Sequence, residues 1–434
     1  MTAPLEISAA RIDAHLRVLA EDIGVRLAGS TGERQAADYI AEEGRRIGAD
    51  VHREGFAVRE RAVAAEGVDV EAGGRWTHFP CSLFSNVPGT GGRAVEAPLV
   101  FFEAPAENLR PDLSHLRGCG VVHLGTHIES RAHYRRLVEA APAFLLFVDI
   151  RYPGAVPLAD GMFPEYARTI GAVPTVNVAF QDAWQWRTQG ATRARLTVDG
   201  GMRDGESANV VLELPGDADE WLFVGGHHDT QAASPGADDN GTGVAAVLEL
   251  ARVLAPVRRR RGLRLVSFGA EEQLSVGSAA YVRRHRAELE RSARFMWNVD
   301  SVGSPLGWTE IIANGTAEMA DWLTRQFAAR GLWAVPRLSV MPYSDHFPFV
   351  ATGVPSAFLY RPNCIAGRFF HHRPDDDRSR VDSRLVADLL GASAALLERL
   401  ATCAELPFPA AIDPAQAEQA RTYWDDLFGG WQAG

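Results

Sequence analysis

The sequence contains few cysteines, and they are widely separated along the chain. The four thiols belong to Cys81, Cys119, Cys364 and Cys403, and no two of them form a CxxC pair. Disulfide frameworks and thiolate zinc sites use cysteines at shorter, repeated spacings. The sequence therefore suggests neither kind of site.

Long apolar runs and dense positive charge are also missing. No stretch approaches the roughly 20 apolar residues that span a bilayer, and residues 1–6 lack the basic region and apolar run of a secretory signal. The formal net charge is -11, and the one dense basic cluster, residues 258–261, has no interleaved aromatic residues and predicts a solvated turn. We therefore expect no membrane partner, no nucleic-acid partner and a cytoplasmic location.

The sequence contains enough hydrophobic residues to form more than one core. It has 434 residues, of which 46% are hydrophobic and 23% charged, as in ordinary globular proteins. A chain of this length exceeds the range in which a single core keeps growing, so we expect two domains. The composition is also compatible with a homo-oligomer.

The chain begins with two predicted helices and continues into a segment with a different pattern of apolar residues, proline and glycine. Residues 12–23 and 30–47 carry apolar residues at helical spacing, and Ser30 with Glu33 has the spacing of a capping box. Residues 62–203 then alternate short apolar runs with proline and glycine, which predicts a strand-rich insert with one convincing helix. Its candidate elements are strands 99–102, 121–124, 144–150 and 173–178 and helix 130–140.

After residue 207, buried strands alternate with helices. The predicted strands are 221–224, 263–268, 295–299 and 355–360, and the predicted helices are 241–254, 278–285, 317–330 and 385–400. This alternation predicts an α/β fold with a mainly parallel mixed sheet sandwiched by helices. In such sheets, functional side chains gather beyond the carboxyl ends of the strands.

Three of these strands end in side chains that can bind a metal ion. His227 follows the first strand, with Asp229 two residues later in a position to orient its ring. Glu271 and Glu272 follow the second strand and point to opposite sides, so one can bind a metal while the other faces a nearby water. Asp300 follows the third strand. Each feature alone is more often structural, but the three together are not expected by chance.

Two loops add further candidates. Asp238 and Asp239 precede a helix, where acids also serve as caps, and His372 lies in a polar loop late in the chain. Two histidines and three carboxylates form a donor set that suits zinc, with cobalt or manganese as substitutes. Five ligands exceed the usual complement of one catalytic zinc and suit two ions about 3.5–4 Å apart.

In order and spacing, these motifs resemble those of the dinuclear zinc aminopeptidases, part of the zinc exopeptidase superfamily. The resemblance spans most of residues 8–60 and 206–401. The matching segments are Arg-Leu-Ala-Gly-Ser at 26–30, Gly-His-His-Asp at 226–229, Pro-Gly-Ala-Asp-Asp at 235–239, Ala-Glu-Glu at 270–272, Asp300, Ser-Asp-His at 344–346 and His372. The resemblance implies a phosphorylase/hydrolase-like catalytic domain formed by residues 1–61 and 204–434. It also implies that residues 62–203 form a protease-associated-like lid domain.

The resemblance further implies a role for each candidate residue. The ligands that it implies are His227 and Asp300 for one zinc, Glu272 and His372 for the other, and Asp239 as the bridge between them. Glu271 would be the general base, and Asp229 would support the first histidine. Several family members have tyrosine directly before the last histidine, where its hydroxyl stabilises the oxyanion, and this chain has His371 there. His371 or Tyr343 would then supply that donor, or the site would stabilise the oxyanion differently. His346 is a further candidate for contacting substrate.

Three functions are compatible with these motifs. The leading hypothesis is an aminopeptidase acting on peptides. The second hypothesis is a carboxypeptidase or an amidase of N-acyl amino acids that uses the same metal site. In that case Arg361, Arg368 or Arg373 would bind the substrate carboxylate. A third, a non-catalytic binding relative, is disfavoured because every ligand and the general base are retained.

Overall fold

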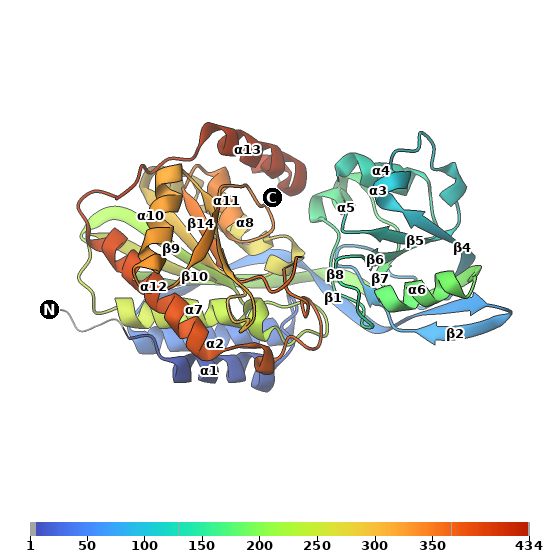
Figure 1. The fold of residues 1–434 in the computed structure, drawn as a ribbon, viewed down its shortest axis with the longest axis horizontal. Coiled ribbons are helices and arrows are strands. Elements are labelled where there is room, and N and C mark those ends of the chain that lie inside the picture. The colour runs from blue at the N-terminus through green and yellow to red at the C-terminus, as the bar shows by residue number, and fades with distance from the viewer. Residues whose placement is uncertain (1–5, 129, 366, 433–434) are drawn as a thin grey trace.

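Two lobes joined by a ribbon of two long strands make up the protein (Figure 1). The computed structural model describes residues 6–128, 130–365 and 367–432. The ribbon consists of β1 (Asp50–Ala72) and β8 (Arg193–Leu214), which pair antiparallel over nearly their whole length. Among the described residues, no helix is long and apolar enough to cross a membrane.

A mixed sheet forms the centre of the larger lobe. Its strands run in the order β13-β12-β14-β11-β9-β10-β8. Parallel pairing joins β10 to β9, β9 to β11 and β11 to β14, whereas β12 and β8 run antiparallel to their neighbours β14 and β10. The predicted mainly parallel mixed sheet is confirmed. The bounds are β9 (Ala218–His227), β10 (Arg261–Phe268), β11 (Ala293–Val299), β12 (Thr309–Asn314), β13 (Ala334–Arg337) and β14 (Ser356–Tyr360).

Helices cover both faces of this sheet (Figure 1). One apolar core joins the sheet to α1 (Ala9–Arg17), α2 (Thr31–Ile47), α7 (Thr242–Leu254), α10 (Ala317–Ala328) and α12 (Ser383–Thr402). The other face is covered by α8 (Val276–Arg284), α9 (Arg286–Ser292), α11 (His346–Ala351) and α13 (Pro414–Phe428). The core on this second face continues into the smaller lobe, where α13 packs against α5 (Pro164–Ile170).

The predicted capping box at the start of α2 is only half formed. Ser30 Oγ accepts a hydrogen bond from the backbone N–H of Glu33 at 3.2 Å, as expected for an N-cap. The Glu33 carboxylate accepts from the N–H of Gly29 at 2.6 Å rather than from Ser30, and it also reaches the larger lobe's sheet. Gly48, at φ 87°, ends the helix in the left-handed conformation that glycine adopts without strain.

The smaller lobe is built on parallel strands. Its strands β4 (Val95–Glu103), β5 (Gly120–Gly125), β6 (Phe144–Asp149) and β7 (Thr175–Asn177) pair in parallel, β3 (Ser82–Leu83) lies at the edge, and β2 (Arg75–Phe79) pairs with β1. Because β4 pairs with β8, the sheets of the two lobes are continuous.

The expectation of one helix in this lobe is wrong. Besides α4 (Arg131–Glu139), the lobe contains α5, α6 (Phe180–Thr188) and the short α3 (Ala104–Glu107). These additional helices are short, and α6 begins without a side-chain cap and carries three aromatic residues, which are poor helix formers. Their sequence therefore gave no clear helical signal.

The predicted domain boundaries fall opposite each other in the ribbon. Glu60 of β1 is paired with Arg203 of β8, and Arg61 with Met202. We propose that residues 62–203 are a separate domain connected through these strands, and their likeness to a protease-associated domain stays a prediction.

Candidate active site

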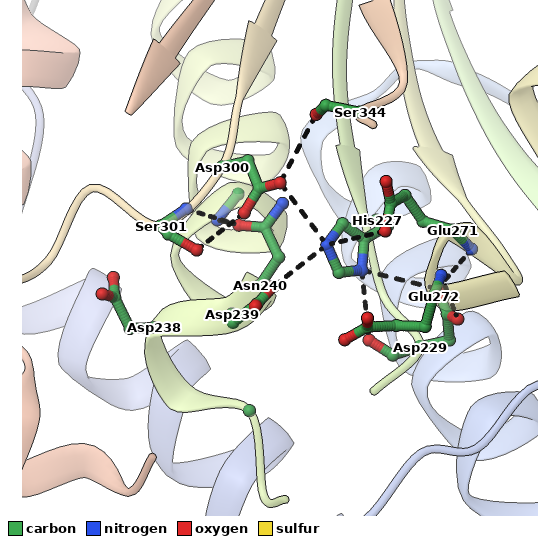
Figure 2. A network of polar contacts seen from close by, with 12 residues as sticks. His227, Asp229, Asp238, Asp239, Asn240, Glu271, Glu272, Asp300, Ser301 and Ser344 are labelled. Atoms are coloured by element: carbon green, nitrogen blue, oxygen red, sulfur yellow. Dashed lines mark hydrogen bonds and ion pairs between the residues drawn. The ribbon is translucent and has the colours of Figure 1, made fainter. Parts of the chain in front are cut away.

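The carboxyl ends of three neighbouring strands bring most of the predicted side chains together (Figure 2). His227 is the last residue of β9, Glu271 and Glu272 follow β10, and Asp300 follows β11. These strands are parallel, so their ends meet at one edge of the sheet. The convergence expected from the sequence is present.

His227 lies at the centre of the cluster with one ring nitrogen unsatisfied. Its Nε2 lies 3.2 Å from Asp239 Oδ1, 3.7 Å from Asp300 Oδ2 and 3.8 Å from Glu271 Oε2. That nitrogen has no hydrogen-bond partner among the described residues, although the side chain is only 1% exposed. An unsatisfied buried nitrogen facing carboxylates is costly unless a cation lies between them. The ligand atoms of His227, Asp239 and Asp300 lie within 4.8 Å of one another, which fits a metal ion.

Asp239 presents its second oxygen to a second group. Its Oδ2 lies 3.6 Å from His372 Nε2 and 3.2 Å from His371 Nδ1, and the ligand atoms of these three residues also lie within 4.8 Å. Glu272 Oε2 lies 2.9 Å from His372 Nε2. The Asp239 carboxylate therefore stands between two histidines, each with further carboxylate neighbours.

The carboxylates in this cluster need positive charge. Burial raises the pKa of the Glu271 carboxyl well above its ordinary value, and the neighbouring charges of Asp345, Glu272 and Asp300 raise it further against the opposing effect of His227. Buried carboxylates at this density are stable in their ionised form only beside cations. The donor set of imidazoles and carboxylates is the one that zinc accepts. The residues present therefore fit a zinc site.

Asp229 connects the histidine to the glutamate pair. Its Oδ1 accepts the backbone N–H of Glu271 at 2.9 Å, and its Oδ2 accepts that of Glu272 at 3.2 Å. The same Oδ1 lies 3.4 Å from His227 Nδ1. The Asp229 carboxylate therefore fixes the backbone that carries both glutamates, while its backbone carbonyl lies 3.2 Å from His227 Nδ1 as the hydrogen-bond partner of the ring. The supporting role of Asp229 stays a prediction.

The matches to known proteins agree with this geometry. The sequence profile of Peptidase family M28 matches residues 209–397, which include every residue of the cluster. That match covers somewhat less than half of the chain. The predicted resemblance to the zinc aminopeptidases and the predicted enzyme class, a metallopeptidase, are confirmed.

Two curated aminopeptidases match this chain over most of its length. Aminopeptidase YwaD of Bacillus subtilis is 28% identical over 379 residues, which cover 84% of this chain and 78% of that protein. The probable lipoprotein aminopeptidase LpqL of Mycobacterium tuberculosis is 29% identical over 303 residues, covering 65% of this chain and 56% of that one.

Solved structures match its fold. The zinc aminopeptidase BSAP from Bacillus subtilis superposes with a TM-score of 0.75 at 20% identity, covering 95% of this chain and all of that one. The M28 peptidase precursor of Shewanella amazonensis gives a TM-score of 0.78 at 20% identity, covering 94% and 98% of the two chains. The predicted α/β fold is confirmed.

Asp376 holds the loop that carries Asp239, a role that the sequence did not indicate. Its two carboxylate oxygens accept the backbone N–H groups of Asp238 and Asp239, both at 3.0 Å. Asp238 in turn accepts the N–H of Gly303 at 2.7 Å. Asp376 follows the polar loop of His372, but only the fold reveals its partners.

A fully buried arginine fastens the same loop to the N-terminal segment. Arg26 is 0% exposed, and burial lowers the pKa of its guanidinium to about 10, which leaves it charged at neutral pH. It donates hydrogen bonds of 2.7–3.0 Å to the backbone carbonyls of Leu19, Gly24, His228, Pro235 and Gly236. The family-like Arg-Leu-Ala-Gly-Ser segment thus contributes a support for the loops on both sides of the metal ligands.

Replacing Arg26 with alanine is expected to lower the free energy of unfolding by about 3–5 kcal/mol. The substitution removes the guanidinium donor from five backbone carbonyls, three of them in buried contacts and two in part-buried ones, and leaves a set of nearby acids without a countercharge. Urea unfolding of the metal-loaded protein measures the effect. Arg17→Ala, which removes a side chain that is 62% exposed, is the matched control and should change the stability little. Equal stability of the two variants would contradict the assigned support role.

The three arginines considered as receptors for a substrate carboxylate are engaged within the chain. Arg368 donates to Asp239 Oδ2 at 2.6 Å and to His371 Nδ1 at 2.8 Å. Arg361 donates to the carbonyls of Ser304 and Gly307 and to Thr309 Oγ1, and Arg373 to the carbonyl of Phe369. Their geometry gives no support to a carboxylate receptor.

A cavity of about 930 Å³ lies in front of the cluster and is lined by both lobes. His371 and Tyr343 line it, and the Tyr343 ring stacks on Phe163 of the smaller lobe with centroids 6.2 Å apart. His346 is fully buried, stacks on Phe358 and is not among the lining residues. Of the three candidates for substrate contacts, the structure therefore brings His371 and Tyr343 to the cavity.

Proposed function

We propose that this protein is an aminopeptidase that cleaves N-terminal residues from peptides with two zinc ions. The observation that carries the proposal is the Asp239 carboxylate, which directs one oxygen to His227 and the other to His372. In this assignment, Asp300 completes the first zinc site and Glu272 the second. The names of the relatives, aminopeptidase YwaD and the zinc aminopeptidase BSAP, support the same activity and metal.

Glu271 has the position expected of a general base. Its Oε1 accepts a hydrogen bond from Ser275 Oγ at 3.1 Å, and its Oε2 faces His227 and the ligand cluster at 3.8 Å. When bound, the zinc ions would polarise the scissile carbonyl and lower the pKa of a water molecule. Glu271 takes the proton from the attacking water and delivers it to the leaving amine.

His371 can stabilise the oxyanion in place of the tyrosine found in several relatives of the family. Arginine has no acceptor atom, so the Arg368 contact makes His371 Nδ1 the acceptor and assigns the ring proton to Nε2. The imidazole then offers an N–H donor at the wall of the cavity. Tyr343 lines the same cavity and is the second candidate for this contact.

The test is to reload metal-free protein with zinc and compare peptides that differ only at the amino terminus. We expect about two zinc ions per chain by elemental analysis, hydrolysis of Leu-Gly-Gly, and no hydrolysis of N-acetyl-Leu-Gly-Gly. Metal-free protein is the control and should be inactive. Equal turnover of both peptides would contradict an aminopeptidase, and saturation at one zinc would contradict the two-ion assignment.

A further inference from the structure

Two carboxylates among the described lining residues of the cavity are not used by the proposed chemistry, and one of them has no strong partner. Of the acidic side chains that line the cavity, Asp239, Glu271, Glu272 and Asp300 belong to the metal and base cluster. Glu310 is 1% exposed and is already paired, since it accepts from Arg337 at 2.5 and 2.6 Å and from the Tyr360 hydroxyl at 2.6 Å. Among the described residues that line the cavity, the remaining carboxylate is that of Asp160, on a loop of the smaller lobe.

The Asp160 carboxylate is held by one oxygen and open at the other. Oδ1 accepts the backbone N–H of Gly161 at 2.8 Å. Oδ2 has His127 Nε2 as an ion-pair neighbour at 3.8 Å, which is too long for a hydrogen bond, and the side chain is 24% exposed in the cavity. The loop thus presents an oriented acceptor with space in front of it.

The loop of Asp160 is attached to the metal-binding loop. The backbone N–H of Ala159 donates to the carbonyl of His372 at 3.1 Å, and the ring of Tyr152 stacks on His371 with centroids 5.6 Å apart. Although burial alone would raise it, the pKa of Asp160 lies below its ordinary value because of the nearby charges of His127 and His372. Asp160 is therefore a carboxylate fixed beside the reacting centre by the opposite lobe.

We propose that Asp160 binds the free α-ammonium group of the peptide substrate and so selects for an uncapped amino terminus. The inference rests on the proposed aminopeptidase function. The α-nitrogen of a substrate is two bonds, or about 2.5 Å, from the scissile carbonyl carbon, so its receptor must lie beside the metal ligands. An ammonium group forms a charge-assisted hydrogen bond with an open carboxylate oxygen, whereas an acylated nitrogen carries no charge to pair with it.

The test compares two metal-binding probes that differ only by the amine. L-leucine hydroxamate and 4-methylpentanohydroxamate are titrated calorimetrically into zinc-loaded wild type, Asp160→Asn and Asp199→Asn. Asparagine keeps the Oδ1 acceptor for Gly161 but removes the charge, and Asp199 is an exposed acid of the same lobe that does not line the cavity. We expect Asp160→Asn to weaken the amine-bearing probe by about tenfold to a hundredfold. It should leave the des-amino probe and the zinc content unchanged, and Asp199→Asn should behave as wild type.

Asp160→Glu, which restores the charge, should recover part of the lost affinity. In steady-state assays with Leu-Gly-Gly, Asp160→Asn should raise KM more than it lowers kcat. Equal weakening of both probes, or of neither, would overturn the role of Asp160. Failure of the wild type to cleave Leu-Gly-Gly would instead refute the proposed function, so the two failures are distinguishable.

Discussion

Glu271→Gln is expected to lower kcat by about 10²–10⁴-fold while leaving the zinc content at the wild-type level. Glutamine has the shape of glutamate and keeps the acceptor for Ser275 Oγ, and the backbone hydrogen bond to Asp229 does not depend on the side chain. Only the capacity to take a proton is lost. Turnover of Leu-Gly-Gly and elemental analysis of the same preparation measure the two quantities.

The adjacent glutamate provides the contrast for this experiment. Glu272 lies 2.9 Å from His372 Nε2, so Glu272→Gln removes a charge from the proposed ligand set and should weaken zinc binding as well as turnover. A Glu271→Gln enzyme with wild-type kcat would exclude Glu271 as the base. Loss of zinc in that variant would show that Glu271 is a metal ligand rather than the general base.

Asp239→Ala should impair both zinc sites at once. Loss of a residue that only hydrogen-bonds to a metal ligand lowers metal affinity by roughly 10–100-fold. We expect Asp239→Ala to lower the zinc affinity by more than this, and the activity to fall in parallel. The reason is that Asp239 faces both histidines, and its removal also leaves the buried guanidinium of Arg368 without its carboxylate. Competition with a chromophoric chelator measures the affinity.

The neighbouring aspartate is the matched control for Asp239→Ala. Asp238→Asn retains the acceptor for the N–H of Gly303 and removes no ligand, so it should bind zinc as the wild type does. Two tightly bound zinc ions in Asp239→Ala would contradict the bridging assignment. Loss of one ion only would show that Asp239 serves a single site.

The parts of the site that follow from local sequence could be predicted. His227, Glu272 and Asp300 end or follow buried apolar strands, and parallel strands place their carboxyl ends at one edge. This step needs only the parallel direction of the strands; their order in the sheet could not be predicted from the sequence. The strand-helix alternation likewise predicted β9, β10, β11, β14, α7, α8, α10 and α12, whereas β1, β8, β12, β13, α9, α11 and α13 were not predicted.

The supporting residues could not be predicted, because their partners lie far away in the sequence. Arg26 contacts the loop at Pro235 and Gly236, which lie 209 and 210 residues later in the sequence. Arg368 is one of three arginines that could receive a substrate carboxylate under the second hypothesis, but it donates to Asp239, 129 residues earlier. Asp160 carried no motif, since its position in the cavity depends on how the smaller lobe is docked.

The cavity between the lobes also decides what size of molecule can react. Because the ribbon of β1 and β8 holds the smaller lobe opposite the strand ends, the candidate site lies in a half-open cavity of about 930 Å³ that both lobes line. A single chain terminus would enter such a cavity more easily than a surface loop, which would have to bring in two strands of backbone side by side. We therefore expect steric exclusion to favour short, flexible peptides over intact folded proteins.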